Sequence, residues 1–235
     1  MNFGKIFLIP TTLGDNDPME VLPIKVKETI AFCNYFIVEN EKTARRFIKK
    51  ICPEKPQPSL QLFILNKHTA IEEISAFLTP CKSGENIGII SEAGCPGIAD
   101  PGAEIVALAH QENIEIIPLV GPSSILLSVM ASGLNGQSFA FNGYLPIDKN
   151  ERKNTLKRLE RRAKEEKQTQ VFIETPFRND ALFQEMLQTL EGSTKLCVAC
   201  DITLPTQYIR TFPISVWKKQ TISFHKRPTI FVIGK

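Results

Sequence analysis

The chain has 235 residues, of which 43% are hydrophobic and 23% are charged, proportions that suit a globular protein with a buried core and exclude a disordered one. No apolar run reaches the ~18–20 residues that a membrane helix needs, and the amino-terminal residues lack the apolar segment of a signal peptide. We therefore predict a cytoplasmic protein with no membrane partner. The net charge of +3 is too small to indicate a nucleic-acid partner by itself.

Six cysteines lie mostly in apolar stretches, where buried free thiols are expected, so we predict no disulfides. Cys197 and Cys200 have the CxxC spacing of a zinc ligand pair, but a tetrahedral zinc site needs two further ligands. His68, His110 and His225 are scattered and belong to no ligand motif. The sequence therefore predicts no metal site.

In the first half of the chain, short apolar runs alternate with amphipathic stretches, a pattern typical of parallel strands joined by helical crossovers. The predicted strands are residues 5–9, 35–38, 60–64, 87–90 and 114–117. The predicted helices are residues 20–32, 42–51, 70–78 and 103–110. Three prolines make residues 52–58 a predicted loop, because proline blocks helix continuation.

The alternation ends near residues 118–122, so we predict two α/β domains, residues 1–118 and 119–235. In the second domain the predicted helices are residues 123–132, 150–167 and 179–190, and the predicted strands are residues 138–141, 170–173, 196–201, 207–212 and 229–233. Several late strands have connections too short for a crossover helix. The fold class is therefore α/β, with a mainly parallel first sheet and a mixed or antiparallel second sheet.

Three loops that follow predicted strands are rich in glycine, proline and small polar residues: residues 10–16, 91–102 and 118–124. In an open α/β sheet, ligands bind beyond the carboxyl ends of the strands, and glycine lets the backbone approach them. Each loop alone is explained equally well as a turn, since Asp100-Pro101 fits a helix N-cap followed by proline. Three such loops at one sheet edge favour a ligand site. A triphosphate or NAD site is not predicted, because the P-loop and the G-x-G-x-x-G motif are both absent.

The same loops carry the motifs of a known family. In chain order they read Pro-Thr-Thr-Leu-Gly-Asp-Asn at residues 10–16, Ser-Glu-Ala-Gly-Cys-Pro at 91–96 with Asp100-Pro101-Gly102, Gly121-Pro122, and Gly133-Leu134 leading to Phe141-Asn142-Gly143-Tyr144-Leu145-Pro146. In order and spacing, over nearly the whole chain, they resemble the tetrapyrrole methylases. Within that family they are most similar to the branch that methylates a cytidine ribose 2′-oxygen in small-subunit ribosomal RNA.

This resemblance implies that S-adenosylmethionine binds in a cleft between the two domains, and that the protein is a homodimer. The cofactor-binding residues that it implies in the first loops are Pro10, Thr11, Thr12, Leu13, Gly14, Ser91, Glu92, Ala93, Gly94, Cys95, Pro96, Asp100, Gly121, Pro122, Ser123 and Ser124. Those that it implies in the second domain are Glu174, Thr175, Pro176, Pro228 and Thr229.

Three departures from the family pattern matter. Glu92 stands where the family has aspartate and Cys95 where it has threonine, and both keep roughly the same polarity. We expect cofactor binding to survive these changes. The family's E-D-T-R after the second strand is here Glu39-Asn40-Glu41-Lys42, at a place expected to face the substrate. This change leaves the identity of the methyl acceptor open.

Methyl transfer to a ribose hydroxyl requires alignment of the reacting atoms and benefits from a general base. Glu39, Glu92 and Asp100 are the candidate carboxylates. Glu39 is the predicted base, although a carboxylate there fits equally a cap for the helix predicted to begin at Lys42. For Asp100 a structural role is the favoured interpretation.

Residues 149–167 are strongly basic, and Lys153, Lys157 and Arg161 repeat every four residues, so they share one face of the predicted helix. This stripe either contacts RNA phosphates or is simply a solvated surface. The same two interpretations apply to a second basic cluster, formed by Lys42, Arg45, Arg46, Lys49 and Lys50.

From the resemblance we predict an S-adenosylmethionine-dependent methyltransferase that acts on a cytidine ribose 2′-oxygen in 16S ribosomal RNA, with the small ribosomal subunit as its partner. A small-molecule methyltransferase with a tetrapyrrole-like substrate is the first alternative. The second is a module that binds S-adenosylmethionine but has lost catalysis, which the changed segment at residues 39–42 makes credible.

Overall fold

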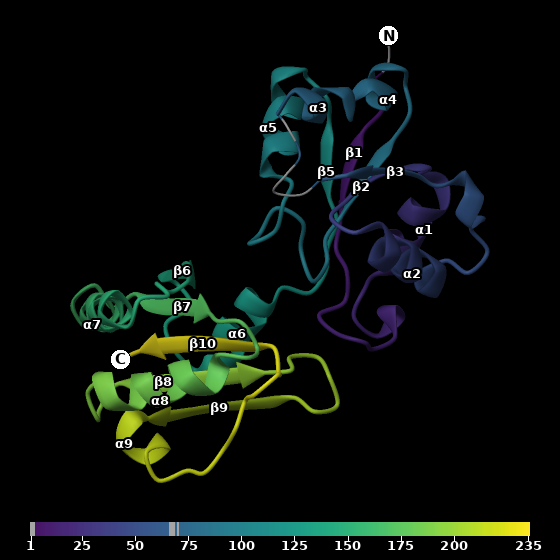
Figure 1. Ribbon diagram of the computed structural model, residues 1–235. Helices are drawn as coiled ribbons and strands as arrows, with labels where there is room; N and C mark the ends of the chain where they lie inside the picture. The colour runs from purple at the N-terminus through teal and green to yellow at the C-terminus, as the bar shows by residue number, and fades with distance from the viewer. Residues whose placement is uncertain (1–2, 66–68, 70) are drawn as a thin grey trace. The chain divides into compact units, whose positions relative to one another are not determined.

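The computed structural model describes residues 3–65, 69 and 71–235 (Figure 1). His68 and the first residue of the helix predicted at 70–78 lie outside these residues. The chain forms two compact units, Met1–Ser123 and Ser124–Lys235, and each has its own sheet. Every helix in the described ranges is too short or too polar to serve as a membrane span.

The first unit is built on sheet A, whose strands lie in the order β3-β2-β4-β1-β5 and are all parallel. These strands are β1 Ile6–Ile9, β2 Tyr35–Val38, β3 Gln61–Ile64, β4 Ile87–Ile90 and β5 Ile116–Pro118. The prediction of a parallel first sheet is confirmed. Strands β2 and β4 match their predicted ranges, because each is a short apolar run that is almost wholly buried.

The helices of the first unit are α1 Ile24–Phe32, α2 Glu41–Ile51, α3 Ile71–Ala76, α4 Thr79–Lys82 and α5 Ala103–Gln111, with 3-10 helices η1 Pro18–Glu20 and η2 Gln57–Ser59. Two predicted ranges were wrong. The helix predicted at 20–32 begins only after Pro23, since proline keeps the residue before it out of the helical conformation. The helix predicted at 70–78 ends at Ala76, and Pro80 lies in the first turn of the separate helix α4.

Helices cover both faces of sheet A (Figure 1). Phe36 of β2 packs with Val26 of α1 and Ile48 of α2. The next residue, Ile37, points to the opposite face and packs with Ile105 of α5, as the alternation of side chains along a strand requires. Because α2 directly follows β2, its first turn lies at the carboxyl edge of the sheet.

The second unit is built on sheet B, with strand order β6-β7-β10-β8-β9. Its strands are β6 Phe139–Tyr144, β7 Thr169–Ile173, β8 Lys195–Cys200, β9 Tyr208–Pro213 and β10 Thr229–Gly234. Strands β6 and β7 are parallel and are joined through α7, whereas the other pairs are antiparallel. The prediction of a mixed second sheet is confirmed.

The helices of the second unit are α6 Ser124–Ser132, α7 Lys149–Glu165, α8 Asn179–Thr189 and α9 Ile214–Trp217. Helix α9 was not predicted, because four residues are too few to show a helical period. Its Trp217 is fully buried against Phe183 and Phe212, and the indole N–H donates to the carbonyl oxygen of Leu196 at 2.8 Å. This aromatic cluster forms the core on the α7–α9 side of sheet B.

The CxxC pair lies inside strand β8, where both thiols are buried and free. Residues three apart on a strand point to opposite faces, and Cys200 packs in the aromatic core that does not include Cys197. Two thiols on opposite faces of a strand cannot hold the same metal ion. The pair is therefore part of the apolar packing of the sheet.

Candidate functional site

The three glycine- and proline-rich loops meet at the carboxyl edge of sheet A. The amide of Thr11 donates to the carbonyl oxygen of Gly94 at 2.9 Å, which joins the loops after β1 and β4. The thiol of Cys95 donates to the carbonyl oxygen of Pro122 at 3.5 Å, which joins the loops after β4 and β5. The prediction that these loops converge is confirmed. The reason is the strand order, which places β1 between β4 and β5.

Two glycines allow this close approach. A Cβ atom at Gly121 would lie 2.3 Å from Cγ of Pro10, so only glycine fits between the first and third loops. Gly94 has a φ of +78°, and a Cβ atom there would lie 3.1 Å from Cδ2 of Leu13 and 3.2 Å from the carbonyl oxygen of Pro122. The loops therefore depend on glycine for both their backbone conformation and their packing.

Two buried hydroxyl groups hold the loops in place. The hydroxyl of Ser91 donates to the carbonyl oxygen of Gly94 at 2.5 Å, and the hydroxyl of Thr11 lies 3.4 Å from Ser91 Oγ. Both side chains are only 4% exposed. Their hydrogen bonds are thus used within the protein, where they join the loop after β1 to the loop after β4.

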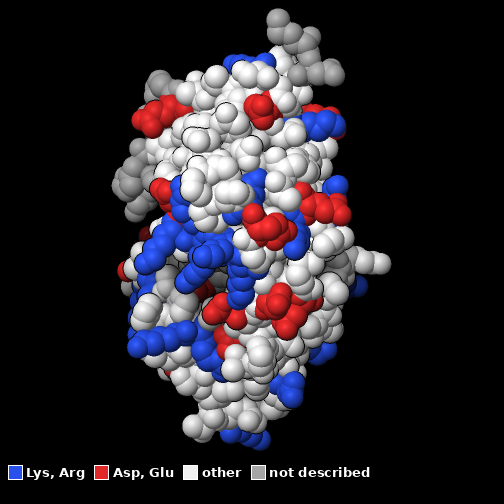
Figure 2. All heavy atoms as spheres, turned by 90° about the vertical axis from the view of Figure 1, so that its right-hand side faces the viewer, with Lys and Arg blue, Asp and Glu red and all other residues white. Residues whose placement is uncertain are grey.

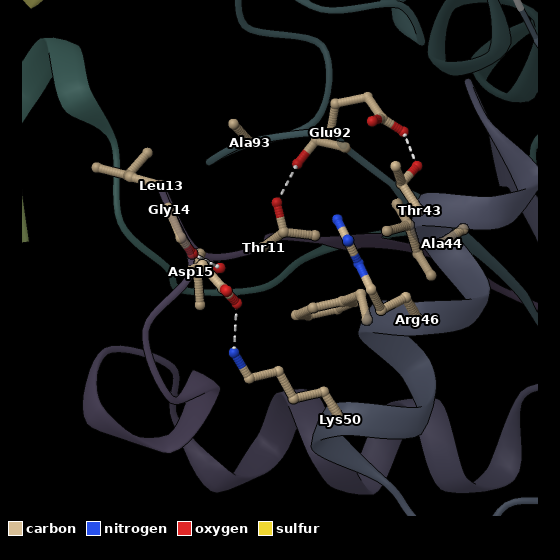
Figure 3. A pocket seen from close by; sticks show the side chains of 14 residues that line it. Thr11, Leu13, Gly14, Asp15, Thr43, Ala44, Arg46, Lys50, Glu92 and Ala93 are labelled. Carbon is tan, nitrogen blue, oxygen red and sulfur yellow. Dashed lines mark hydrogen bonds and ion pairs between the residues drawn. The ribbon is translucent and has the colours of Figure 1, made fainter. Parts of the chain in front are cut away.

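A cavity of about 310 Å³ opens between these loops and α2 (Figure 3). This volume lies near the lower end of the roughly 300–1,000 Å³ that is usual for small-molecule sites. Its lining residues are Thr11, Thr12, Leu13, Gly14, Asp15, Thr43, Ala44, Arg46, Phe47, Lys50, Ile90, Ser91, Glu92 and Ala93. Of the predicted residues of the first two loops, Thr11, Thr12, Leu13, Gly14, Ser91, Glu92 and Ala93 line this cavity. Its lining does not include Pro10, Gly94, Cys95, Pro96, Asp100 or Gly121–Ser124.

Glu92 connects the loop after β4 to the first turn of α2. Its carboxylate accepts a hydrogen bond from the hydroxyl of Thr43 at 2.6 Å (Figure 3). The side chain of Asn40 caps α2, accepting from the amides of Lys42 at 2.9 Å and Thr43 at 3.3 Å. The interpretation of Glu39 as the cap of this helix is therefore wrong, because Asn40 already satisfies the first amides.

The α2 wall of the cavity carries two cations in different environments. Lys50 donates to Asp15 Oδ1 at 2.8 Å and to the carbonyl oxygen of Asn16 at 3.0 Å. The bond from Lys50 lowers the pKa of Asp15 below its ordinary value. Arg46 points toward the loops that carry Thr11 and Glu92 (Figure 3), and it makes no hydrogen bond or ion pair with any described residue.

Glu39 and Asp100 lie together beside a small hollow at the same sheet edge, next to Val38, Leu65 and Ile90. Burial, with the negative charge of Glu39 as the next contribution, raises the pKa of Asp100 to about 6. Asp100 therefore exchanges its proton close to neutral pH, next to a second carboxyl group. Such shifted carboxyl pairs are typical of sites that transfer protons.

The alternative role for Asp100-Pro101, an N-cap followed by proline, is wrong. The N-cap residue of α5 is Gly102, with a φ of +129°, and no side chain caps the helix. The chain between β4 and α5 is thus a true loop of twelve residues, 91–102, and its length is not explained by helix capping.

In the second unit, the two segments with predicted cofactor contacts lie side by side. The amide of Lys226 donates to the carbonyl oxygen of Pro176 at 2.9 Å, and the side chain of Asn179 donates to the carbonyl oxygen of Arg227 at 2.6 Å. Glu174 is buried and accepts from the amide of Thr175 and from Arg178, each at 2.6 Å. The cofactor contacts of Glu174, Thr175, Pro176, Pro228 and Thr229 stay predictions.

That α2 forms a wall of the cavity was not predicted. The basic residues of this helix are evident in the sequence, but their place beside the loops is not. The missing information was the strand order: β2 pairs with β4, so the helix after β2 begins next to the loop after β4. The cavity residues that were not predicted are Asp15, Thr43, Ala44, Arg46, Phe47, Lys50 and Ile90.

Comparison with known proteins assigns this arrangement to a family. The sequence profile of the Tetrapyrrole (Corrin/Porphyrin) Methylases matches residues 5–216. The chain is 28% identical over 233 residues to the Ribosomal RNA small subunit methyltransferase I of Buchnera aphidicola, covering 98% of this chain and 78% of that protein. It is 29% identical to the protein of the same name from Thermotoga maritima, over 85% of this chain and 84% of the relative.

Solved structures agree on the fold. The methyltransferase CobJ superposes with a TM-score of 0.64 at 16% identity, over 99% of this chain and 94% of that chain. The cobalt precorrin-4 methyltransferase CbiF gives a TM-score of 0.63 at 13% identity, over 98% and 94% of the two chains. At these identities the likeness concerns the fold alone.

Proposed function

The chain belongs to the tetrapyrrole methylase family, and from this premise we propose that it transfers a methyl group from S-adenosylmethionine to the 2′-oxygen of a cytidine ribose in 16S ribosomal RNA. The observation that carries the proposal is the shared name of relatives that align with most of the chain, all of them small-subunit ribosomal RNA methyltransferases. The protein would then act in the cytoplasm, with the small ribosomal subunit as its partner.

The loops of the first unit fit a nucleoside-like cofactor with a positively charged sulfur. Gly14 and Ala93 add little side-chain bulk to the wall of the cavity, and Asp15 and Glu92 are the carboxylates that line it. The residues that would hold the cofactor are those of segments 10–14, 91–96 and 121–124. S-adenosylmethionine supplies an activated methyl group, so the protein has mainly to bind, align and exclude water.

We propose that Glu39 accepts the proton of the ribose hydroxyl. The new bond joins the ribose oxygen to the methyl carbon, the carbon–sulfur bond breaks, and the hydroxyl proton passes to the Glu39 carboxylate. Glu39 directly follows β2 and is exposed, so a substrate can reach it, and the partly buried Asp100 lines the same small hollow. With a pKa of about 6, Asp100 is a second group that can hold a proton near neutral pH.

The protein is also proposed to be a homodimer. Helix α6 buries Ile125 and Val129 in the second unit, but its outer face exposes Leu126 by 52% and Met130 by 77%. Apolar side chains four residues apart on a helix form a continuous patch that favours burial against a partner. Sedimentation analysis should find a dimer for the wild type and a monomer for Met130→Glu. A monomeric wild type would contradict this proposal.

The decisive experiment is transfer of labelled methyl from S-adenosylmethionine to small ribosomal subunits isolated from cells that lack the gene. We expect label in the RNA, and mapping should place it on the 2′-oxygen of a cytidine. Labelling of heme-pathway intermediates in place of RNA would support the small-molecule alternative. Cofactor binding by calorimetry without turnover on any acceptor would support the inactive module, and absence of cofactor binding would reject all three functions.

A further inference from the structure

Helix α2 is strongly basic, and its five cations fall into two groups. Arg45 donates to Glu41 at 2.7 Å and to the carbonyl oxygen of Gln57 at 2.8 Å, and Lys50 pairs with Asp15. The other three cations have no ion pair or side-chain hydrogen bond within the described part of the chain. These unpaired cations are Lys42, Arg46 and Lys49.

The three unpaired cations, which we call the α2 stripe, share one face of the helix. Their spacing of four and three residues places them within one side of the helical wheel and extends over about 10 Å of its axis. All three are exposed, and the opposite face of α2 is buried through Ala44 and Ile48. Figure 2 shows Lys and Arg side chains gathered on the side where α1 and α2 lie in Figure 1.

Arg46 joins the α2 stripe to the cavity. It lines the cavity with Thr11 and Glu92, and its side chain points toward the loops that carry them (Figure 3). A guanidinium group has a planar set of donors that matches two oxygens of a phosphate, and it stays charged at every physiological pH. An anion bound by Arg46 would therefore lie at the mouth of the cavity where the proposed methyl donor binds.

We propose that the α2 stripe binds the phosphate backbone of the RNA strand that contains the target ribose, with Arg46 holding the phosphate nearest the cavity. This inference rests on the proposed function. A cofactor carboxylate would need only one cation, whereas three unpaired cations along about 10 Å fit a chain with one negative charge per nucleotide. Arg46 thus positions the ribose next to the cofactor loops.

The test compares Arg46→Ala with Arg45→Ala, a matched change at the next residue, whose charge Glu41 already neutralises. For Arg46→Ala we expect the KM for small ribosomal subunits to rise roughly tenfold, because one charge-assisted phosphate contact is lost. The slope of log KM against log salt should fall by about 1. For Arg45→Ala we expect less than about a threefold change, and Arg46→Lys should recover part of the loss.

Arg46 could bind either an RNA phosphate or the carboxylate of the cofactor, and calorimetry with S-adenosylmethionine distinguishes the two. Unchanged cofactor affinity in Arg46→Ala supports an RNA phosphate, and weakened cofactor affinity with an unchanged KM for subunits overturns the proposal. Affinity for a short single-stranded RNA, measured by fluorescence anisotropy, does not depend on turnover. If the wild type transfers no methyl group, the proposed function fails, but the RNA affinity still tests the role of the α2 stripe. Equal RNA affinity of the wild type and Arg46→Ala, or no RNA binding by either, overturns the proposal that the α2 stripe binds RNA.

Discussion

Helices α2 and α7 are both rich in lysine and arginine, but their charges are used differently. On α7, Arg152 pairs with Glu185 at 2.6 Å and Lys164 pairs with Glu191 at 2.6 Å. Two further arginines of α7 have glutamate partners four residues later, at 3.3 and 4.0 Å. Four further cations of α7 are exposed and lack such partners in the described residues: Lys149, Lys153, Lys157 and Arg158. On α2, all three unpaired cations share one face, and one of them, Arg46, lines the cavity beside the loops after β1 and β4.

The charges that line the cavities beside the two helices do not by themselves distinguish them. The hollow along α7 has a volume of about 420 Å³, larger than the cavity beside α2, and three carboxylates balance its three cations. In the α2 cavity, Asp15 and Glu92 likewise equal the two cations in number. The cations are Lys157, Arg161 and Lys164, and the carboxylates are Glu160, Glu165 and Glu191. Neither the volume of a cavity nor the number of nearby cations therefore predicts an anion site. The α2 cavity differs in its position, because Arg46, which has no ion pair in the described residues, lies there beside the loops after β1 and β4.

The largest expected effect concerns the residues just before α2. If the RNA reacts next to the start of α2, Glu39 is the general base. The variant Glu39→Gln should then lower kcat for methyl transfer by roughly 100-fold or more, the usual contribution of such a base. Cofactor affinity should stay unchanged, because the substitution removes only the proton acceptor. Single-turnover methyl transfer and calorimetry measure the two quantities. A kcat within threefold of the wild type would exclude Glu39 as the base.

Charge reversal tests the comparison of the two helices directly. The triple variant Lys42→Glu, Arg46→Glu, Lys49→Glu should raise the KM for small ribosomal subunits by about 100-fold, since attraction to phosphates becomes repulsion. The variant Lys153→Glu, Lys157→Glu on α7 should change the KM by less than about threefold. The assay is methyl transfer at constant ionic strength. An equal rise in KM for the α2 and α7 variants would show that the two helices do not differ in RNA binding.

The cations of α7 should matter more for stability than for RNA binding. Arg152 and Glu185 are only 16% and 10% exposed, so Arg152→Ala leaves a nearly buried carboxylate without its partner. We expect a loss of about 2–3 kcal/mol in the free energy of unfolding, measured with urea. Arg46→Ala, which removes no ion pair, should stay within about 0.5 kcal/mol of the wild type. Similar stabilities for the two variants would argue against a structural role for the α7 pairs.

The smallest expected effect is a pH dependence at Asp100. Because folding raises its pKa from 3.8 to about 6, this group stabilises the fold fully below about pH 4, and that contribution is lost as the pH rises through 6. The uncharged variant Asp100→Asn should equal the wild type near pH 4 and be about 1 kcal/mol more stable above pH 6, a value reduced for the partial exposure of the group. Urea titrations between pH 4 and 8 measure the difference. A constant difference at all pH values would contradict the raised pKa.

Much of the fold followed from local signals in the sequence. Strands β2 and β4 and the loops after β1, β4 and β5 were predicted because apolar runs, glycine and proline act on the backbone within a few residues. The prolines at 23 and 80, which set where α1 and α4 begin, are local signals of the same kind but were overlooked. Helix α9 was too short to be predicted. The loop motifs were also sufficient to indicate the family.

The site itself depends on contacts that no local pattern contains. Glu92 bonds to Thr43 across 49 residues, Lys50 to Asp15 across 35, and Arg152 to Glu185 across 33. The sequence determined that α2 and α7 are basic, because residue type and helical period are local properties. Only the tertiary structure decided which of their charges are neutralised and which helix forms a wall of the cavity, because strand order and packing bring distant carboxylates to some cations and leave others without a partner.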